Sequence, residues 1–231
     1  MAKIDFKQVT TLTFDCYGTL VDWERGACTA LRKLMPNCSS QITDDELIRA
    51  FLVADSHLIK GEWMPYECIL AKAAAEVCMS FGQPLDQTGE AEFVASLPTW
   101  PLFEETIPAL FELSQKYRLA IISNINDHLI EQTLINFPVT FDVITTSERT
   151  RSYKPEMEIF TQALQELGGQ ASSIIHVAEG LCEATPARKL GMASIWVRRT
   201  VRSDDGSGAT PDVTIASLSE LVELLSEKTD V

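Results

Sequence analysis

The sequence predicts an α/β fold, a doubly wound parallel sheet into which an all-helical segment is inserted. Short continuous apolar runs recur along the chain, and amphipathic stretches separate them. Continuous apolar runs are typical of strands that are buried on both faces of a parallel sheet. Residues 22–97 hold helical patterns and no convincing strand, which predicts the insertion.

Five apolar runs are expected to form the strands of the sheet. They are TTLTFD (10–15), LAIISN (119–124), FDVITT (141–146), SIIHVA (173–178) and ASIWVR (193–198). Amphipathic stretches such as TIPALFELSQKY and PEMEIFTQALQELGG lie between them, and glycines end the second. This alternation from about residue 100 onward is typical of βαβ units.

The insertion contains three helical patterns, RGACTALRKLM, DDELIRAFLVADSHLIK and YECILAKAAAEVCMSFG. The chain leaves it through SLPTWPLF, in which two prolines suit a hinge. We therefore expect a sheet core formed by residues 1–21 and 98–231 and a helical cap domain at 22–97. VRSDDGSGATPD (201–212) has the composition of a flexible polar loop.

The composition is that of a soluble globular protein, with 45% hydrophobic and 23% charged residues. A net charge of −14 argues against nucleic acid as a partner, and no run approaches the ~20 apolar residues of a membrane span. The N-terminus lacks the apolar region of a signal peptide, and the six cysteines show no CxxC pairing. These features predict a cytoplasmic protein with reduced thiols.

Polar residues gather where the predicted strands end. Asp15, Ser123, Asn124 and the segment AEGLCE each follow an apolar run, and Lys154 follows another by a loop. Ligands of open parallel sheets bind at the carboxyl ends of the strands. The sequence therefore predicts a small-molecule site at this edge, where a lysine supplies the positive charge that an acidic surface lacks.

Four segments together resemble the motifs of the haloacid dehalogenase (HAD) superfamily. FDCYGTLVDW resembles the first motif, SN at 123–124 the second, YKP at 153–155 the third, and HVAEGLCEATPARKLGM (176–192) the fourth. Their order and spacing, and the helical segment between the first two, match over essentially the whole chain. The resemblance implies a Rossmann-like core with an inserted cap domain, and a hydrolase.

Tyr17 distinguishes two branches of that superfamily. The phosphatase branch carries a second aspartate two positions after its nucleophile, as general acid and Mg²⁺ ligand. A phenol with a pKa of about 10 stays neutral and binds Mg²⁺ poorly. DCYGT resembles instead the (S)-2-haloacid dehalogenase branch, which implies a metal-independent reaction without a cofactor.

In that branch the aspartate aligned with Asp15 attacks a substrate carbon, forms an ester and is released by water. A carboxyl group with a pKa of about 3.9 is ionised at pH 7 and needs no base. Lys154 would hold the carboxylate anionic, and Thr19 would hydrogen-bond it across the turn. Residues expected to contact the substrate are Cys16, Tyr17, Trp23, Arg49, Ser123 and Asn124. Each of these side chains also has a purely structural interpretation, as turn, hinge or surface residue.

The fourth motif departs from the resemblance. Haloacid dehalogenases position the ester-cleaving water with a serine, an asparagine and an aspartate, where this chain has Ala178, Gly180 and Glu183. Glu183 can still accept a proton, but its carboxylate lies about one methylene farther out. Glu179 falls near the metal-binding aspartate of the phosphatases. His176 is expected to be a core histidine.

Further departures concern the leaving group. Arg49 is the nearest candidate for the halide-binding arginine of the cap, and Phe160 stands where a tyrosine is expected. Dehalogenation and the opening of a strained ring such as L-azetidine-2-carboxylate both remain open. A Mg²⁺-dependent phosphatase and a non-catalytic binding protein are the alternatives, and the apolar helical insertion is compatible with a homodimer.

Overall fold

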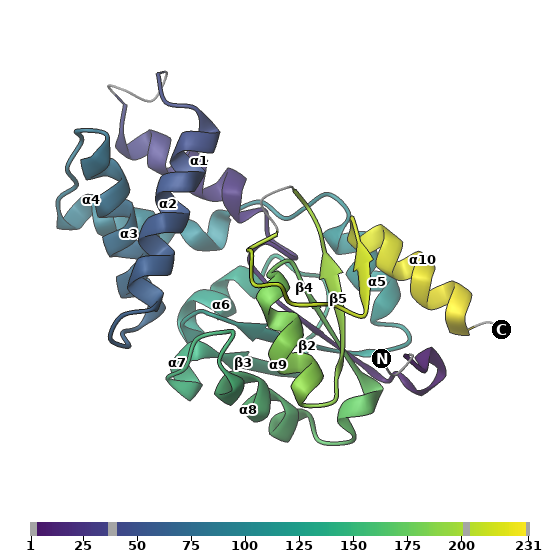
Figure 1. Cartoon of the computed structure of the whole chain (residues 1–231). Coiled ribbons are helices and arrows are strands. Elements are labelled where there is room, and N and C mark those ends of the chain that lie inside the picture. The colour runs from purple at the N-terminus through teal and green to yellow at the C-terminus, as the bar shows by residue number, and fades with distance from the viewer. Residues whose placement is uncertain (1–3, 37–40, 201–203, 230–231) are drawn as a thin grey trace. The chain divides into compact units, whose positions relative to one another are not determined.

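The computed structural model describes residues 4–36, 41–200 and 204–229. These residues form two compact units (Figure 1). One comprises Met1–Val21, Leu102–Ser123 and Phe137–Val231 and contains the sheet; the other comprises Asp22–Pro101 and Asn124–Asn136 and is helical. The helical unit thus ends at residue 101, where the sequence predicts 97, and it also takes in a segment that follows the second strand.

The sheet unit is built on six parallel strands in the order β3-β2-β1-β4-β5-β6 (Figure 1). The strands are β1 (Thr11–Phe14), β2 (Arg118–Ser123), β3 (Val143–Thr146), β4 (Ile174–Ala178), β5 (Ala193–Val197) and β6 (Val213–Ile215). All residues of β1 and β4 are buried, as the apolar runs predict. The doubly wound parallel α/β fold is confirmed.

The edge strand β6 was not expected, because its three residues do not form an apolar run. Its only buried residue is Ile215, and its partner is β5 alone. Before it, residues 204–212 of the predicted polar loop form no helix or strand, while residues 201–203 of that loop lie outside the described residues.

Helices and short 3-10 segments precede, connect and follow the strands of the sheet unit. The helices are α5 (Thr106–Leu113), α7 (Ser147–Thr150), α8 (Met157–Leu167), α9 (Ala184–Lys189) and α10 (Leu218–Thr229). The 3-10 segments are Phe6–Gln8, Ala171–Ser173 and Leu181–Glu183. Ile159, Phe160 and Ala163 of α8 pack against Ile122 of β2 and Ile174 of β4 in one buried cluster. Helix α8 is therefore packed closely against the sheet.

The helical unit consists of α1 (Trp23–Leu34), α2 (Asp44–Ile59), α3 (Tyr66–Ser80), α4 (Gln87–Ser96), a 3-10 turn at Leu97–Thr99, and α6 (Asp127–Leu134). The three predicted helices correspond to α1, α2 and α3. Thr43 begins α2 with a capping box, in which its hydroxyl and the Glu46 carboxylate satisfy each other's backbone N–H groups. Helix α4 escaped prediction because it is short and includes Gly89.

A chain of aromatic rings forms the centre of the helical unit. The ring centroids of Trp23 and Phe51 lie 5.7 Å apart, those of Phe51 and Phe93 5.8 Å, and those of Phe93 and Trp100 6.0 Å. A Cβ atom on Gly26 would lie 2.2 Å from Trp100 Cγ. Gly26 is therefore required for Trp100 to pack against α1.

The half-buried Asp55 of α2 makes the stability of the helical unit depend on pH. Its Oδ1 accepts a hydrogen bond of 3.0 Å from the Tyr66 hydroxyl, and burial raises its pKa to about 6. The folded chain thus holds a proton that the unfolded chain, with a carboxyl pKa of about 3.9, releases earlier. Stability from this group is present at acidic pH and is lost as pH rises through about 6.

We expect Asp55→Asn to raise the free energy of unfolding at pH 7 by about 1 to 2 kcal/mol, because the amide removes the buried charge. Urea denaturation at pH 7 and at pH 4.5 measures the effect. The difference between the two proteins should fall to roughly a third at pH 4.5 and disappear below the unfolded pKa of about 3.9, and this fall serves as the internal control. Equal stability at both pH values would contradict the prediction.

Candidate active site

Asp15 lies directly after β1, the strand between β2 and β4 in the sheet. Its backbone N–H donates to the Val177 carbonyl of β4 at 3.0 Å, and the residue is 7% exposed. The following turn closes through a hydrogen bond from Gly18 N–H to the Val21 carbonyl, and Gly18 has a φ of 108°, which favours glycine. The turn returns Thr19 to Asp15, where its hydroxyl donates to Oδ2 at 2.8 Å.

Lys154 connects two carboxylates. Its Nζ lies 2.6 Å from Asp15 Oδ1 and 2.9 Å from Glu183 Oε2, and it also donates to the Ile122 carbonyl at 3.0 Å. The three donors of an ammonium group are thus matched by three acceptors. The predicted nucleophile, lysine and fourth-motif acid therefore meet at the carboxyl ends of the strands.

Glu183 ends the 3-10 segment that follows β4, and it is 5% exposed. Its Oε2 accepts from Lys154 and also lies 3.0 Å from His176 Nε2. A Cβ atom on Gly180 would lie 2.7 Å from Glu183 Oε1. The missing side chain at Gly180 therefore makes room for the longer acid.

The turn that carries Thr19 is held from two sides. The Glu179 backbone N–H donates to Thr19 Oγ1 at 2.8 Å, and the Glu179 carbonyl accepts from Trp196 Nε1 at 2.8 Å. Arg199, beyond β5, donates from Nη2 to the Thr19 carbonyl at 2.6 Å and from Nη1 to Glu105. These contacts hold the Thr19 hydroxyl against Asp15.

The charges of the cluster depend on one another. Burial raises the pKa of Asp15 above its ordinary value, and the Lys154 ammonium and the Thr19 hydroxyl oppose that rise. Burial disfavours the charge of Lys154 as well, but the two carboxylates outweigh it and raise its pKa. Burial also opposes the charge of Glu183, yet Lys154 and His176 bring its pKa below the ordinary value. The lysine between the two acids thus opposes the protonation that burial favours at Asp15 and at Glu183.

Three predicted substrate contacts belong to the sheet unit. Cys16 is fully buried, and burial and the neighbouring Asp15 raise the pKa of its thiol well above the ordinary value, so the thiol stays protonated. Tyr17 is half-buried and forms a β-bridge with Val21. Ser123 ends β2 and is 1% exposed.

The other three predicted contacts, Asn124, Trp23 and Arg49, belong to the helical unit. Trp23 begins α1 and packs against Phe51. Arg49 lies on the surface of α2 with its side chain 70% exposed, and its Nε is 2.6 Å from Asp45 Oδ2. Their contact with a substrate stays a prediction.

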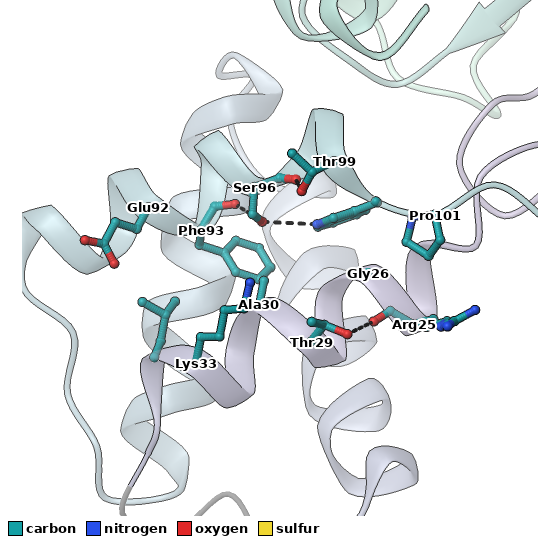
Figure 2. A pocket seen from close by; sticks show the side chains of 12 residues that line it. Arg25, Gly26, Thr29, Ala30, Lys33, Glu92, Phe93, Ser96, Thr99 and Pro101 are labelled. Carbon is teal, nitrogen blue, oxygen red and sulfur yellow. Dashed lines mark hydrogen bonds between the residues drawn. The ribbon is translucent and has the colours of Figure 1, made fainter. Parts of the chain in front are cut away.

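The helical unit also contains a cavity of about 400 Å³ (Figure 2). Its lining includes Arg25, Thr29, Lys33, Glu92, Phe93 and Trp100. Neither Trp23 nor Arg49 lines this cavity.

The described residues hold no group of three or more histidine, cysteine, aspartate or glutamate side chains arranged to hold a metal ion. Within the described residues, no disulfide joins Cys16, Cys28, Cys68, Cys78 or Cys182, and Cys38 lies outside those residues. No helix within residues 4–36, 41–200 and 204–229 has the length and hydropathy that crossing a bilayer requires.

Residues 9–191 match the family of haloacid dehalogenase-like hydrolases. The chain belongs to this hydrolase family. The match covers the first three motifs that the sequence suggested and all but the last residue of the fourth, which ends at residue 192.

Among curated proteins, this haloacid dehalogenase-like hydrolase is 26% identical to the (S)-2-haloacid dehalogenase of Pseudomonas sp. (strain YL), over 92% of this chain and 93% of the relative. It is 25% identical to haloacetate dehalogenase H-2 of Moraxella sp. (strain B), over 95% of this chain and 99% of that relative. Its fold matches that of L-2-haloacid dehalogenase from Xanthobacter autotrophicus with chloropropionic acid covalently bound, with a TM-score of 0.80, 17% identity, and coverage of 94% of this chain and 98% of that one.

The sequence did not predict the roles of two residues near Asp15, namely His176 and Arg199. His176 is buried as predicted for a core histidine, but its contact with Glu183 was not foreseen. Arg199 was not singled out at all. A histidine among the apolar residues of β4, seven positions before the motif acid, was the available signal for the first. The contacts of Arg199 with Thr19 and Glu105 arise from tertiary packing alone, and no sequence pattern indicates them.

Proposed function

We propose that this hydrolase acts without a metal on a small 2-substituted carboxylic acid, through an ester formed on Asp15. The observation that carries the proposal is the bridge of Lys154 between Asp15 and Glu183. It joins a carboxylate that can attack carbon to a second carboxylate that can activate water.

In the first step a carboxylate oxygen of Asp15 attacks C2 of the substrate, and the bond from C2 to the leaving group breaks. Lys154 and Thr19 orient the attacking carboxylate through bonds of 2.6 and 2.8 Å. The negative charge leaves with the leaving group, so Asp15 becomes a neutral ester. Lys154 then has Glu183 as its remaining anionic partner in the cluster.

In the second step water attacks the ester carbonyl carbon of Asp15 and gives a proton to Glu183. The tetrahedral intermediate collapses, the acyl carbon–oxygen bond breaks, and the departing alkoxide takes the proton from Glu183. The product is a 2-hydroxy acid, and Asp15 releases a proton to return to its carboxylate. Glu183 thus acts as base and then as acid.

Ser123 and the backbone N–H groups of Cys16 and Tyr17, all of the sheet unit, bind the substrate carboxylate. The leaving group is a halide. This substrate class is supported by the names of the dehalogenases to which the chain is similar. A ring nitrogen, released from L-azetidine-2-carboxylate, is the alternative leaving group.

A substrate panel tests the proposal. L-2-chloropropionate, D-2-chloropropionate, L-azetidine-2-carboxylate and an aryl phosphate are each incubated with the enzyme, and the hydroxy acid, halide or phosphate is quantified. We expect turnover of one 2-substituted acid and none of the aryl phosphate. Hydrolysis of the phosphate alone would replace the proposal with the phosphatase alternative. Reaction of none would support a non-catalytic binding role.

Activity should survive EDTA, because Tyr17 occupies the position where a phosphatase places its second acid. We expect the rate after chelation and desalting to lie within about twofold of the untreated rate. Mg²⁺ should show no micromolar binding in calorimetry. Restoration of a chelator-inactivated enzyme by Mg²⁺ would contradict the prediction and point to Glu179 and Glu183 as ligands.

A further inference from the structure

The buried His176 makes two hydrogen bonds that the proposed reaction does not use. Its Nδ1 lies 2.9 Å from Thr13 Oγ1, and its Nε2 lies 3.0 Å from Glu183 Oε2. Thr13 and His176 are paired in register between β1 and β4. The ring also packs edge-on against Phe160, with 5.2 Å between the centroids. The imidazole is thus fixed in position and in rotation.

The hydrogen bond to Glu183 has one direction. A carboxylate only accepts hydrogen bonds, so the proton lies on Nε2 of His176. Oε2 of Glu183 then receives two donors, His176 Nε2 and Lys154 Nζ. Within the described residues, Oε1 receives no hydrogen bond, and it faces the space left by Gly180. The two carboxylate oxygens of Glu183 therefore differ in their hydrogen bonding, and Oε1 keeps its capacity to accept a proton.

We propose that His176 is a positioning residue for ester hydrolysis, which holds Glu183 by Oε2 and so leaves Oε1 to take the proton of the attacking water. This inference rests on the proposed function. Without the imidazole, the side chain of Glu183 could rotate and present either oxygen, since Lys154 alone would hold it. The proton transfer of the second step would then lose its fixed geometry, while the attack by Asp15 would keep Lys154 and Thr19.

Two variants separate positioning from packing. His176→Phe keeps the ring volume beside Phe160 and removes the donor. His176→Gln retains an amide donor that can reach the place of Nε2. Single-turnover mixing with 2-chloropropionate, or with the panel substrate that reacts, followed by acid quench and mass spectrometry gives the rates of ester formation and ester hydrolysis separately.

We expect His176→Phe to slow ester hydrolysis at least about tenfold and to change ester formation less than about threefold, so that the adduct on Asp15 accumulates. His176→Gln should recover most of the lost hydrolysis rate. Unchanged hydrolysis in His176→Phe would overturn the inference. Equal slowing of both steps, without recovery in His176→Gln, would also overturn it, because that result indicates a packing role.

A measurement on the resting protein does not depend on any substrate. With ¹⁵N-labelled histidine, NMR shows which ring nitrogen carries the proton, and the chain has only three histidines, so His176→Gln assigns the signal. We expect a slowly exchanging proton on Nε2 that exchanges faster in Glu183→Gln. A proton on Nδ1 alone would overturn the inference. A wild-type protein that turns over no substrate of the panel would refute the proposed function, whereas this NMR result would still report on the contact.

Discussion

Replacing Asp15 with asparagine is expected to lower turnover at least about 10³-fold while the chain remains folded. The amide keeps the shape of the side chain and its hydrogen bond from Thr19, but it cannot attack carbon as a carboxylate does. Lys154 keeps Glu183 and the Ile122 carbonyl as partners, so the ammonium is not left unpaired. Circular dichroism and the kcat for the best substrate of the panel measure the two parts of this prediction.

Asp142→Asn is the matched control, because it makes the same chemical change at an exposed side chain of the sheet unit. It should leave kcat within about twofold. Retention of more than about a tenth of the wild-type rate in Asp15→Asn would remove Asp15 from the role of nucleophile.

Glu183→Gln should give the second largest effect, and it should act on a single step. Without a base for water, ester hydrolysis should fall at least about 10²-fold, whereas Asp15 and Lys154 should still form the ester. The enzyme is then trapped after one turnover as a covalent adduct, which mass spectrometry of the peptide that contains Asp15 detects. The same experiment on the wild-type enzyme should show little adduct.

Glu183→Asp examines the shape of the site. The shorter side chain draws the carboxylate away from His176 and leaves unfilled the space that Gly180 provides. We expect slower ester hydrolysis than in the wild-type enzyme, but less adduct than in Glu183→Gln. Full activity in both variants would mean that another group activates the water.

The sheet and the centre of the site could be predicted because both depend on local pattern. The sequence runs that form β1, β2, β4 and β5 are apolar enough to be predicted as buried strands. In a parallel sheet, the residues at the carboxyl ends of the strands lie at the same edge. The meeting of Asp15 with Lys154 follows from that topology. By contrast, β6 and α4 are too short and too polar to show the hydrophobic periodicity of a strand or a helix.

The finer contacts depend on packing that no spacing encodes. His176 has the sequence context of a core residue, and only the register of β1 beside β4 shows that it faces Thr13. Glycine at position 180 looks like the loss of a functional side chain, but the structure shows that Glu183 Oε1 lies 2.7 Å from the place where a Cβ atom would lie. The pKa of Asp15 also depends on packing. A free aspartate is fully ionised at pH 7, whereas burial in the folded chain raises the pKa of Asp15.

The formation of an ester on Asp15 is tested most directly by a single turnover in H₂¹⁸O with enzyme in excess over substrate. Water attacks the acyl carbon of the ester, so the hydroxyl oxygen of the product comes from Asp15 and the water oxygen stays on Asp15. We expect ¹⁸O in the Asp15 peptide and ¹⁶O in the hydroxyl group of the first product. Product labelled with ¹⁸O in the first turnover, with no label in Asp15, would contradict the ester mechanism and indicate direct attack by water.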